Sequence, residues 1–354
     1  MQLPIAVRQQ IEDRAEALGF AALKRAAAAL SDAYREGRTP RLGDAERTAA
    51  YLVTRMPATF AAAHAVLDEV AARVDAIGSG AETGADSPAT FAAAHDGAIR
   101  GVLDAGAGTG ADSSAAHSAP RAPGAIRGVL DAGAGTGAAS LAARAHFPHA
   151  AITMVERDGA FARAARQWLP DAALIAADIA RPEALPPHDL VIAAYSLGEF
   201  GAPLAARLWQ AARVALVLIE PGTPRGFALI RQVRGDLLAA GARMVAPCPA
   251  ETECPMADPD WCHFAARVER SSLHRRLKGG DLGYEDEKFS YVALARQSVD
   301  LPEARIIRHP MHHPGLIEIE TCTPAGLRSE RIARRDRERF RAARKAAWGD
   351  AGIS

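Results

Sequence analysis

Apolar residues in the first part of the chain recur with the spacing of an α-helix. Ile11 and Ala15 lie four residues apart, and Val70 and Val74 repeat that spacing further along. Residues four positions apart share one face of a helix, and an apolar face of this kind is normally buried. Residues 1–77 are therefore predicted to form a helical N-terminal domain.

From residue 124 onward, short apolar runs alternate with amphipathic stretches. Candidate strands are 127–131, 151–155, 173–177, 189–194 and 214–219, with helices near 137–146, 159–167, 203–212 and 226–240. Such alternation is typical of a parallel sheet with helices on its faces. We therefore expect an α/β fold with a doubly wound, Rossmann-like sheet. Further strands are expected near 242–246 and 289–295, then a hairpin over 305–321 and a basic helix over 327–348.

The chain contains one segment twice. Residues 97–111 recur letter for letter at 124–138. Identical segments have identical local propensities, so the flanking sequence decides which copy can build an element. The second copy is followed by the helix-forming run 138–147, whereas the first is followed by Pro- and Ser-rich residues that favour neither helix nor strand. We expect the second copy to build structure, and 78–123 to be a flexible, duplicated insertion.

The second copy ends a predicted strand with Asp131-Ala-Gly-Ala-Gly-Thr-Gly137. Glycines at the turn from a strand to a helix let the backbone approach a ligand closely. Glu156 follows the next predicted strand, where a carboxylate can accept hydrogen bonds from ribose hydroxyls. Asp178 follows the third strand, where it would meet an adenine amino group. The expected cofactor-binding residues are Asp131, Gly133, Gly135, Gly137, Glu156 and Asp178.

The glycine spacing distinguishes two nucleotide cofactors. NAD-binding domains use Gly-x-Gly-x-x-Gly, and the last position of that pattern is Ala138 here. The spacing of Gly133, Gly135 and Gly137 fits S-adenosylmethionine better. After the fourth strand comes Ala194-Tyr-Ser-Leu-Gly-Glu-Phe200, which lacks the Asn/Asp-Pro-Pro-aromatic motif of many amino methyltransferases. The sequence therefore predicts the cofactor but assigns no catalytic residue.

All four cysteines lie in the last third of the chain, at Cys248, Cys254, Cys262 and Cys322. Four thiols in a chain that starts without an export signal suggest a metal site before a disulfide framework. Soft thiolates suit zinc or an iron–sulfur cluster, and the lack of Cys-x-x-Cys spacing favours the cluster. His263 is a rival ligand, and four unconnected buried thiols are the simpler alternative.

A second chemistry for these thiols is nucleophilic catalysis. RNA cytosine-C5 methyltransferases use cysteines after Pro and after Thr, and Pro247-Cys248 and Thr321-Cys322 match those pairs. In those enzymes the Pro-Cys pair follows the fourth strand, whereas Cys248 lies beyond the fifth. The mismatch in position makes this the weaker alternative.

Charge limits the kinds of partner. The 354-residue chain has 42 basic and 42 acidic residues, so any nucleic-acid contact must come from a local patch. A solvated surface with internal ion pairs is the alternative for each basic cluster. With no signal peptide and no apolar run of about 18 residues, we expect a cytoplasmic protein outside the membrane. The expected RNA-contacting residues are Arg270, Arg275, Arg276, Lys278, Arg334, Arg335 and Arg341.

Several further segments occur in a specific order. They are Ala50-Tyr-Leu-Val-Thr-Arg-Met-Pro-Ala-Thr-Phe60, the glycine motif, Ile219-Glu-Pro-Gly-Thr-Pro-Arg-Gly-Phe227, Asp260-Trp-Cys-His-Phe264 and Tyr284-Glu-Asp-Glu-Lys-Phe-Ser-Tyr291. In this combination the chain resembles the methyltransferase-like assembly factors of the small ribosomal subunit, found in bacteria and mitochondria. The resemblance covers nearly the whole chain outside 78–123. It implies a class I S-adenosylmethionine-dependent methyltransferase fold, with a seven-stranded core, a helical N-terminal domain and a cysteine-rich metal-binding insertion.

The resemblance also implies ligands and partners. The cysteines of that family hold a [4Fe–4S] cluster, which assigns all four cysteines of this chain as ligands, with zinc as the alternative. Its members associate with small-subunit rRNA and proteins, and we expect a monomer off the ribosome. Two functions stay open: an rRNA methyltransferase, and a catalytically silent RNA-binding assembly factor that uses both sites structurally. The expected divisions are helices 1–77, insertion 78–123, methyltransferase core 124–247, cysteine-rich region 248–326 and basic C-terminal helix 327–354.

Overall fold

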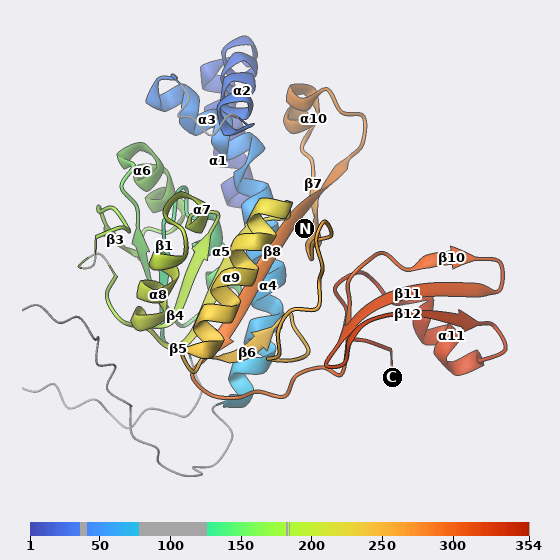
Figure 1. Ribbon diagram of the computed structural model, residues 1–354. Coiled ribbons are helices and arrows are strands. Elements are labelled where there is room, and N and C mark those ends of the chain that lie inside the picture. Colours follow the sequence, from blue (N-terminus) through green and yellow to red (C-terminus); the bar gives the residue numbers. More distant parts are fainter. Residues whose placement is uncertain (36–40, 78–125, 182, 184, 354) are drawn as a thin grey trace, which may run out of the picture.

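A mixed β-sheet forms the centre of the protein (Figure 1). The computed structural model describes residues 1–35, 41–77, 126–181, 183 and 185–353, and the duplicated segment 78–123 lies outside them. The strand order is β3-β2-β1-β4-β5-β8-β6, and β7 also pairs with β8. The strands are β1 (Gly128–Ala132), β2 (Ala151–Val155), β3 (Ala173–Ile175), β4 (His188–Ala194), β5 (Ala212–Pro221), β6 (Arg243–Ala246), β7 (Phe264–Glu269) and β8 (Tyr284–Ala295).

The first five strands run parallel, and β8 runs antiparallel to β5, β6 and β7. A strand that is buried on both faces reads as a continuous apolar run, and Leu190 to Ala193 in β4 are all buried. Successive side chains point to opposite faces, so Val129 and Leu130 belong to different hydrophobic clusters. The predicted doubly wound α/β sheet is confirmed.

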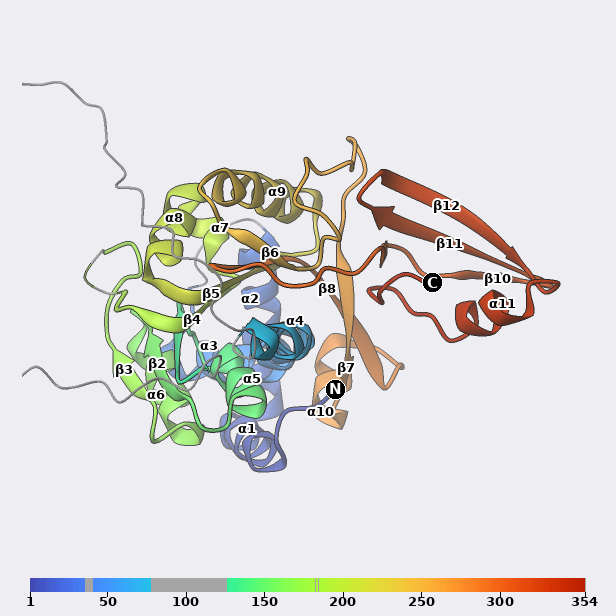
Figure 2. The same ribbon diagram turned by 90° about the horizontal axis from the view of Figure 1, so that it is seen from below.

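Helices cover both faces of this sheet (Figure 2). On one face pack α8 (Ala202–Ala211) and α9 (Pro224–Ala239), and on the other α4 (Met56–Ile77), α5 (Ala138–His146) and α6 (Gly159–Trp168). The short α7 (Leu197–Phe200) follows β4. The second copy of the repeated segment forms β1, the glycine loop and the start of α5, as predicted. No described helix is long and apolar enough to cross a membrane.

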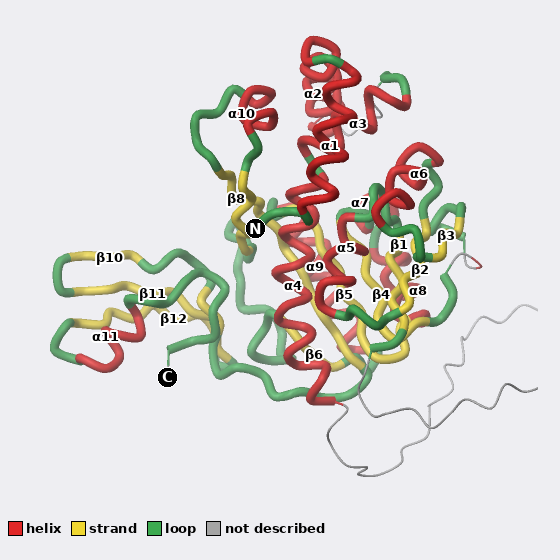
Figure 3. The backbone as a smooth tube through the Cα atoms, turned by 180° about the vertical axis from the view of Figure 1, so that it is seen from behind, coloured by secondary structure: helices red, strands yellow, loops and turns green. Residues whose placement is uncertain are grey.

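The helices predicted for the first part of the chain are present. They are α1 (Ile5–Leu18), α2 (Phe20–Arg35), α3 (Asp44–Thr54) and α4. Leu67 and Val70 of α4 are fully buried and lie in the same hydrophobic cluster as Val129 and Ile192 of the sheet. Figure 3 shows α4 running along the sheet from behind. The N-terminal helices and the sheet therefore share one core.

A second, four-stranded sheet projects from the side of the first (Figure 1). Its strands are β9 (Arg305–Ile306), β10 (Met311–His313), β11 (Leu316–Thr323) and β12 (Gly326–Ala333), and α11 (Arg337–Ala343) packs on it. Its small core consists of Ile306, Ile317, Ile319, Ile332 and Ala343. Between β7 and β8 lies α10 (Ser272–Lys278), at the end of a two-stranded ribbon.

The C-terminal region contains the main differences from the sequence predictions. The basic helix predicted over 327–348 is wrong, because most of the first eight positions belong to β12 and α11 covers only Arg337–Ala343. Arginine favours helices in isolation, but pairing with a neighbouring strand overrides such local preference. The hairpin expected over 305–321 is present as β10 and β11, and β11 also pairs with β9 and β12. The predictions omitted β7 and α10.

Candidate functional site

A pocket lies at the carboxyl ends of β1, β2 and β4. The loop between β1 and α5 lines it with Gly133 and Gly135, whose φ angles are 78° and 55°. Glycine adopts this left-handed conformation without strain, and its missing side chain leaves room for a ligand. In open α/β sheets, ligands bind at this edge where the strand order reverses, which here is between β1 and β4. The fold therefore places the glycine motif at the expected ligand-binding edge.

Glu156 lies beside the glycine loop, directly after β2. It is buried and accepts hydrogen bonds from the N–H groups of Gly135 at 2.7 Å and Asp158 at 2.6 Å. Burial raises the pKa of Glu156, and the two backbone donors act against that shift. The carboxylate lines the pocket from a position where it can accept hydrogen bonds from a ligand's hydroxyl groups.

Asp178 lines the pocket beyond β3. It accepts a hydrogen bond from the N–H of Ala180 at 2.9 Å, and Arg157 pairs with it at 3.1 Å. These two interactions lower the pKa of Asp178, the backbone hydrogen bond most strongly. Arg157 also pairs with Glu199 at 3.2 Å, so it connects the segments that follow β2, β3 and β4. This end of the pocket is polar and open to solvent.

The other two predicted cofactor residues lie behind the glycine loop and do not line the pocket. Asp131 is buried and accepts a hydrogen bond from the Ser140 hydroxyl at 2.6 Å. Burial raises the pKa of Asp131 to about 6. Gly137 has a φ of 79°, and a Cβ at this position would lie 3.1 Å from the Cβ of Ala165. Both residues therefore shape the loop from behind.

Helix α3 supplies a wall of the pocket that the sequence analysis did not assign. Arg47 pairs with Asp158 at 2.5 Å, and its guanidinium carbon lies 4.7 Å from the centroid of the Phe161 ring. Tyr51 packs on the same ring, with 4.8 Å between centroids. In the sequence, residues 50–60 contribute only to the family resemblance, and nothing in that segment indicates which part of the chain it contacts. Tertiary packing alone brings it to the glycine loop.

The segment after β4 closes another side of the pocket. Tyr195 has a φ of 59°, and no other described non-glycine residue has a positive φ. Bulky residues rarely adopt this conformation, and such outliers cluster at functional sites. The Tyr195 hydroxyl donates to Oε1 of Glu287 at 3.0 Å, and the Ser196 hydroxyl donates to the carbonyl of Ala132 at 3.1 Å. These contacts fix the segment, and none of them identifies a general base.

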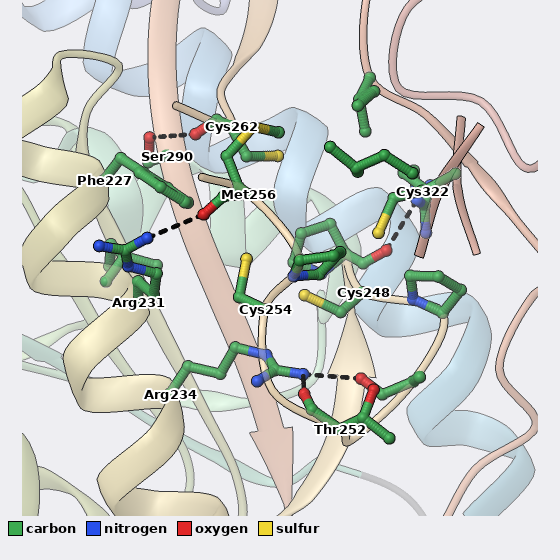
Figure 4. A pocket seen from close by; sticks show the side chains of 18 of the residues that line it. Phe227, Arg231, Arg234, Cys248, Thr252, Cys254, Met256, Cys262, Ser290 and Cys322 are labelled. Carbon is green, nitrogen blue, oxygen red and sulfur yellow. Dashed lines mark hydrogen bonds between the residues drawn. The ribbon is translucent and has the colours of Figure 1, made fainter. Parts of the chain in front are cut away.

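The four cysteines line a second cavity (Figure 4). Cys248 follows β6, Cys254 and Cys262 lie in the loop that leads to β7, and Cys322 comes from β11. The fold thus brings the distant fourth cysteine to the other three, at the junction of the two sheets. All four are free thiols.

Burial dominates the chemistry of this cavity. It raises the pKa of the Cys248 thiol. It also raises the pKa of Cys322 to about 12 and the pKa of Cys262 well above its usual value. Neighbouring sulfurs add to these shifts, because several thiolates in one small space repel each other. Arg234 and Arg305 also line the cavity and act in the opposite direction on Cys248.

The described residues contain no group of three or more His, Cys, Asp or Glu side chains that could hold a metal ion. His263, the rival ligand, does not line the cysteine cavity. Its ring stacks on Trp261, at 5.4 Å between centroids, and meets Trp348 edge-on at 4.7 Å. Cys248 and Cys322, the pair required by the cytosine-C5 alternative, lie in the cysteine cavity, and no cysteine is among the described residues that line the glycine pocket.

The predicted RNA-contacting residues fall into two groups. Near α10, Arg270 and Lys278 pair with Glu285 at 2.7 and 2.8 Å, and Arg276 lies over the Phe20 ring at 4.3 Å. Here the internal ion pairs of the alternative interpretation are present. All of the predicted residues except Arg270 are exposed, and the second group consists of Arg334 and Arg335 after β12 and Arg341 on α11.

Comparison with known families gives a match over about two thirds of the chain. A family model described as mitochondrial small ribosomal subunit Rsm22 matches residues 113–352. Two curated proteins of Schizosaccharomyces pombe, the mitochondrial Rsm22-cox11 tandem proteins 1 and 2, are each 29% identical over 185 residues. The match covers 38% of this chain and only 24% of each relative.

The solved structures similar to this chain include two methyltransferases. A precorrin-6y C5,15-methyltransferase of Geobacter metallireducens is 17% identical, with a TM-score of 0.33 over 48% of this chain and 79% of that one. A TehB-like S-adenosylmethionine-dependent methyltransferase of Corynebacterium glutamicum is 16% identical, with a TM-score of 0.33 over 51% and 83% of the two chains.

Proposed function

The chain belongs to the mitochondrial small ribosomal subunit Rsm22 family, and on this premise we propose that it is an S-adenosylmethionine-binding, methyltransferase-like factor of the small ribosomal subunit. One observation carries the cofactor part of the proposal. Gly133 and Gly135 leave room for the ligand, and Glu156 offers the carboxylate that accepts hydrogen bonds from ribose hydroxyls. Asp178 is then the partner for the adenine amino group.

Calorimetric titration of the full-length protein with S-adenosylmethionine tests the cofactor site. We expect binding to the wild type and none to Gly135→Arg, because an arginine with a φ of 55° is strained and its side chain fills the pocket. Gly241→Arg is the control, since this glycine also has a positive φ but does not line the cofactor pocket. A wild-type protein that binds no S-adenosylmethionine would falsify the proposal.

Two versions of the proposed function differ in turnover. Methyl transfer to rRNA needs an acceptor held in line with the sulfonium, and positioning alone supplies much of the rate. A silent assembly factor would use the same ligand only to hold its shape. Incubation with methyl-labelled S-adenosylmethionine and immature small subunits separates them. Label in rRNA that Gly135→Arg abolishes supports the enzyme, whereas subunit binding without label supports the silent factor.

We extend the proposal to a [4Fe–4S] cluster in the cysteine cavity, held by Cys248, Cys254, Cys262 and Cys322. The donor set fits, because it consists of soft thiols beside the guanidinium groups of Arg234 and Arg305. A single ion needs its ligands around one point, whereas a cluster offers a separate iron to each thiolate. Sulfurs spaced around a cavity suit the cluster better. When bound, it would cross-link the cysteine loop to β11 and supply a redox-active centre.

Anaerobic purification followed by iron and sulfide analysis tests the cluster. We expect two signals: iron and sulfide in equal amounts, and broad absorbance at about 400 nm. Cys322→Ser should lose both signals. Thr323→Ser, at the next position of β11, serves as the control and should keep both signals. Stoichiometric zinc without iron or sulfide would establish the alternative metal.

The proposed contact with small-subunit rRNA is assigned to the exposed arginines after β12 and on α11. Deleting the chain from 327 would remove β12, the partner of the strand that carries Cys322, so substitutions are the cleaner test. Changing Arg334, Arg335 and Arg341 to Gln should weaken RNA binding and lower its salt slope by about 1 per lost phosphate contact.

The matched control for this experiment replaces exposed arginines elsewhere. Arg25, Arg163 and Arg213 are exposed on other parts of the molecule, and their Gln variants should leave the slope unchanged. Equal slopes for both triple variants would show that the C-terminal arginines are only solvated.

A further inference from the structure

Helix α3 crosses the mouth of the cofactor pocket with one face turned towards it. Arg47, Tyr51 and the residue that ends the helix, Arg55, follow at intervals of four, so they lie on the same side. All three line the pocket together with the glycine loop. These three side chains form a row along α3 that covers the pocket. Each member of the row lies over a different strand end of the sheet.

The first two members of this row meet the ends of β2 and β1. Arg47 pairs at 2.5 Å with Asp158, which follows β2. The Tyr51 hydroxyl lies 4.0 Å from the position that a Cβ on Gly135, in the loop after β1, would occupy. From Arg47 to Tyr51, the helix thus passes from the ribose side of the pocket to the glycine loop.

The third member pairs with Glu287 of β8, and through it lies near the end of β4. Nη2 of Arg55 lies 3.9 Å from Oε1 of Glu287, and the same oxygen accepts the hydrogen bond from Tyr195, the first residue after β4. The side chains of Arg55 and Glu287 are 29% and 15% exposed, so both charges are partly withdrawn from water. Opposite charges in such a place interact more strongly with a charged ligand than they would at the surface.

The strand order fixes how a ligand would lie under this row. The sheet presents β3, β2, β1 and β4 side by side in that order. A cofactor whose ribose meets Glu156 after β2, and whose adenine points to Asp178 beyond β3, must extend the rest of its length over the glycine loop towards β4. The amino-acid end of S-adenosylmethionine therefore reaches Arg55, while Arg47 stays beside the ribose.

We infer that Arg55 binds the carboxylate of the amino-acid part of S-adenosylmethionine, an inference that rests on the proposed cofactor site. The Arg55–Glu287 pair offers one charge of each sign to a zwitterionic group that also carries one of each. A guanidinium binds a carboxylate through two parallel hydrogen bonds. The N-terminal helices thus supply a specificity-determining residue of the pocket.

Two ligands that differ only in the carboxylate test this assignment: S-adenosylmethionine and decarboxylated S-adenosylmethionine. Titrations with the full-length wild type should give about ten- to a hundredfold tighter binding of the carboxylated ligand. Arg55→Gln should remove this preference by weakening only the carboxylated ligand, and Arg55→Lys should keep part of it. Arg163→Gln, an exposed arginine on α6, is the control and should bind both ligands as the wild type does.

The outcomes separate the inference from the cofactor site itself. If Arg55→Gln keeps the full preference, or if it weakens both ligands equally, Arg55 does not bind the carboxylate, although the pocket still binds the cofactor. If the wild type binds neither ligand, the cofactor site is wrong, and the assignment of Arg55 fails with it. Equal unfolding midpoints of the variants and the wild type verify that the comparison concerns folded protein.

Discussion

Glu220, at the end of β5, is a buried carboxylate that supports the pocket from behind. It accepts hydrogen bonds from the N–H groups of Leu197 at 2.8 Å and Gly198 at 3.2 Å, and so holds the start of α7 just after Tyr195. Burial raises the pKa of Glu220 to about 7, although the backbone donors oppose that shift. A single titrating side chain thus lies beneath the segment that closes the pocket.

This pKa shift predicts a specific pH dependence of stability. Between about pH 4.5 and 7, folded Glu220 holds a proton that the unfolded chain has released, so stability falls as pH rises through that window. The effect is on the order of 3 kcal/mol. Glu220→Gln should remove it, so the variant should gain stability relative to the wild type from pH 5 to 7.5. Urea unfolding at a series of pH values measures this.

The control for the pH experiment is Glu338→Gln, which changes an exposed carboxylate on α11. Its stability should follow that of the wild type at every pH. A parallel pH profile for Glu220→Gln would mean that Glu220 titrates normally in the folded protein.

Among the elements, the two-residue strand β9 connects several distant segments through Arg305. Its buried Arg305 donates hydrogen bonds to the carbonyls of Pro247 at 2.8 Å and Gly349 at 2.6 Å, and pairs with Glu69 on α4. One guanidinium thus connects the residue before Cys248, the C-terminal segment and the longest described helix. Without Arg305, the carbonyls of Pro247 and Gly349 would lose their charged donor, at a cost of about 1–3 kcal/mol for each buried group, whereas Glu69 would keep Arg73 at 3.2 Å.

We therefore expect Arg305→Met to loosen the attachment of the second sheet. Limited proteolysis should cleave the chain faster between β8 and β10 in this variant, and denaturant unfolding should shift by several kcal/mol. Arg308→Met is the matched control, because Arg308 pairs with Asp260 nearer the surface and such pairs contribute at most about 1 kcal/mol. Equal cleavage rates in the two variants would contradict a specific role for Arg305.

At the scale of the whole molecule, the cores divide the chain differently from the sequence divisions. One hydrophobic cluster joins α1 and α4 to α5 and the central sheet, whereas β9 to α11 have a separate core of five buried residues. Small cores open at lower free energy than large ones. The second sheet is therefore the part expected to open first.

Hydrogen exchange of the full-length protein tests this division. The amides of α4 should exchange as slowly as those of β4 and β5, because all three share one core. Those of β10, β12 and α11 should exchange markedly faster. An N-terminal segment that exchanges as a unit of its own, well before the sheet, would indicate a separately folded helical domain.

The parts of the fold and site that the sequence predicted well are those defined within a short stretch of chain. β4 and β5 contain continuous apolar runs because both faces of the sheet are buried there, and the sequence itself shows this pattern. The glycine loop required left-handed backbone at Gly133 and Gly135, and only the sequence after the second copy could supply the following helix. Local chemistry was sufficient in both cases.

The remaining features depend on contacts between residues far apart along the chain. Residues 326–333 include Leu, Arg and Glu residues that favour a helix, yet they form a strand because they pair with β11 and because Ile332 is buried in the small core. No sequence pattern near Tyr51 or Arg55 indicates that α3 lies over the glycine loop. That loop comes much later in the chain, after the whole helical region. The sequence by itself determined which residue types were present and where backbone could turn, whereas only the tertiary structure decided which of them meet, because that choice depends on burial shared by distant segments.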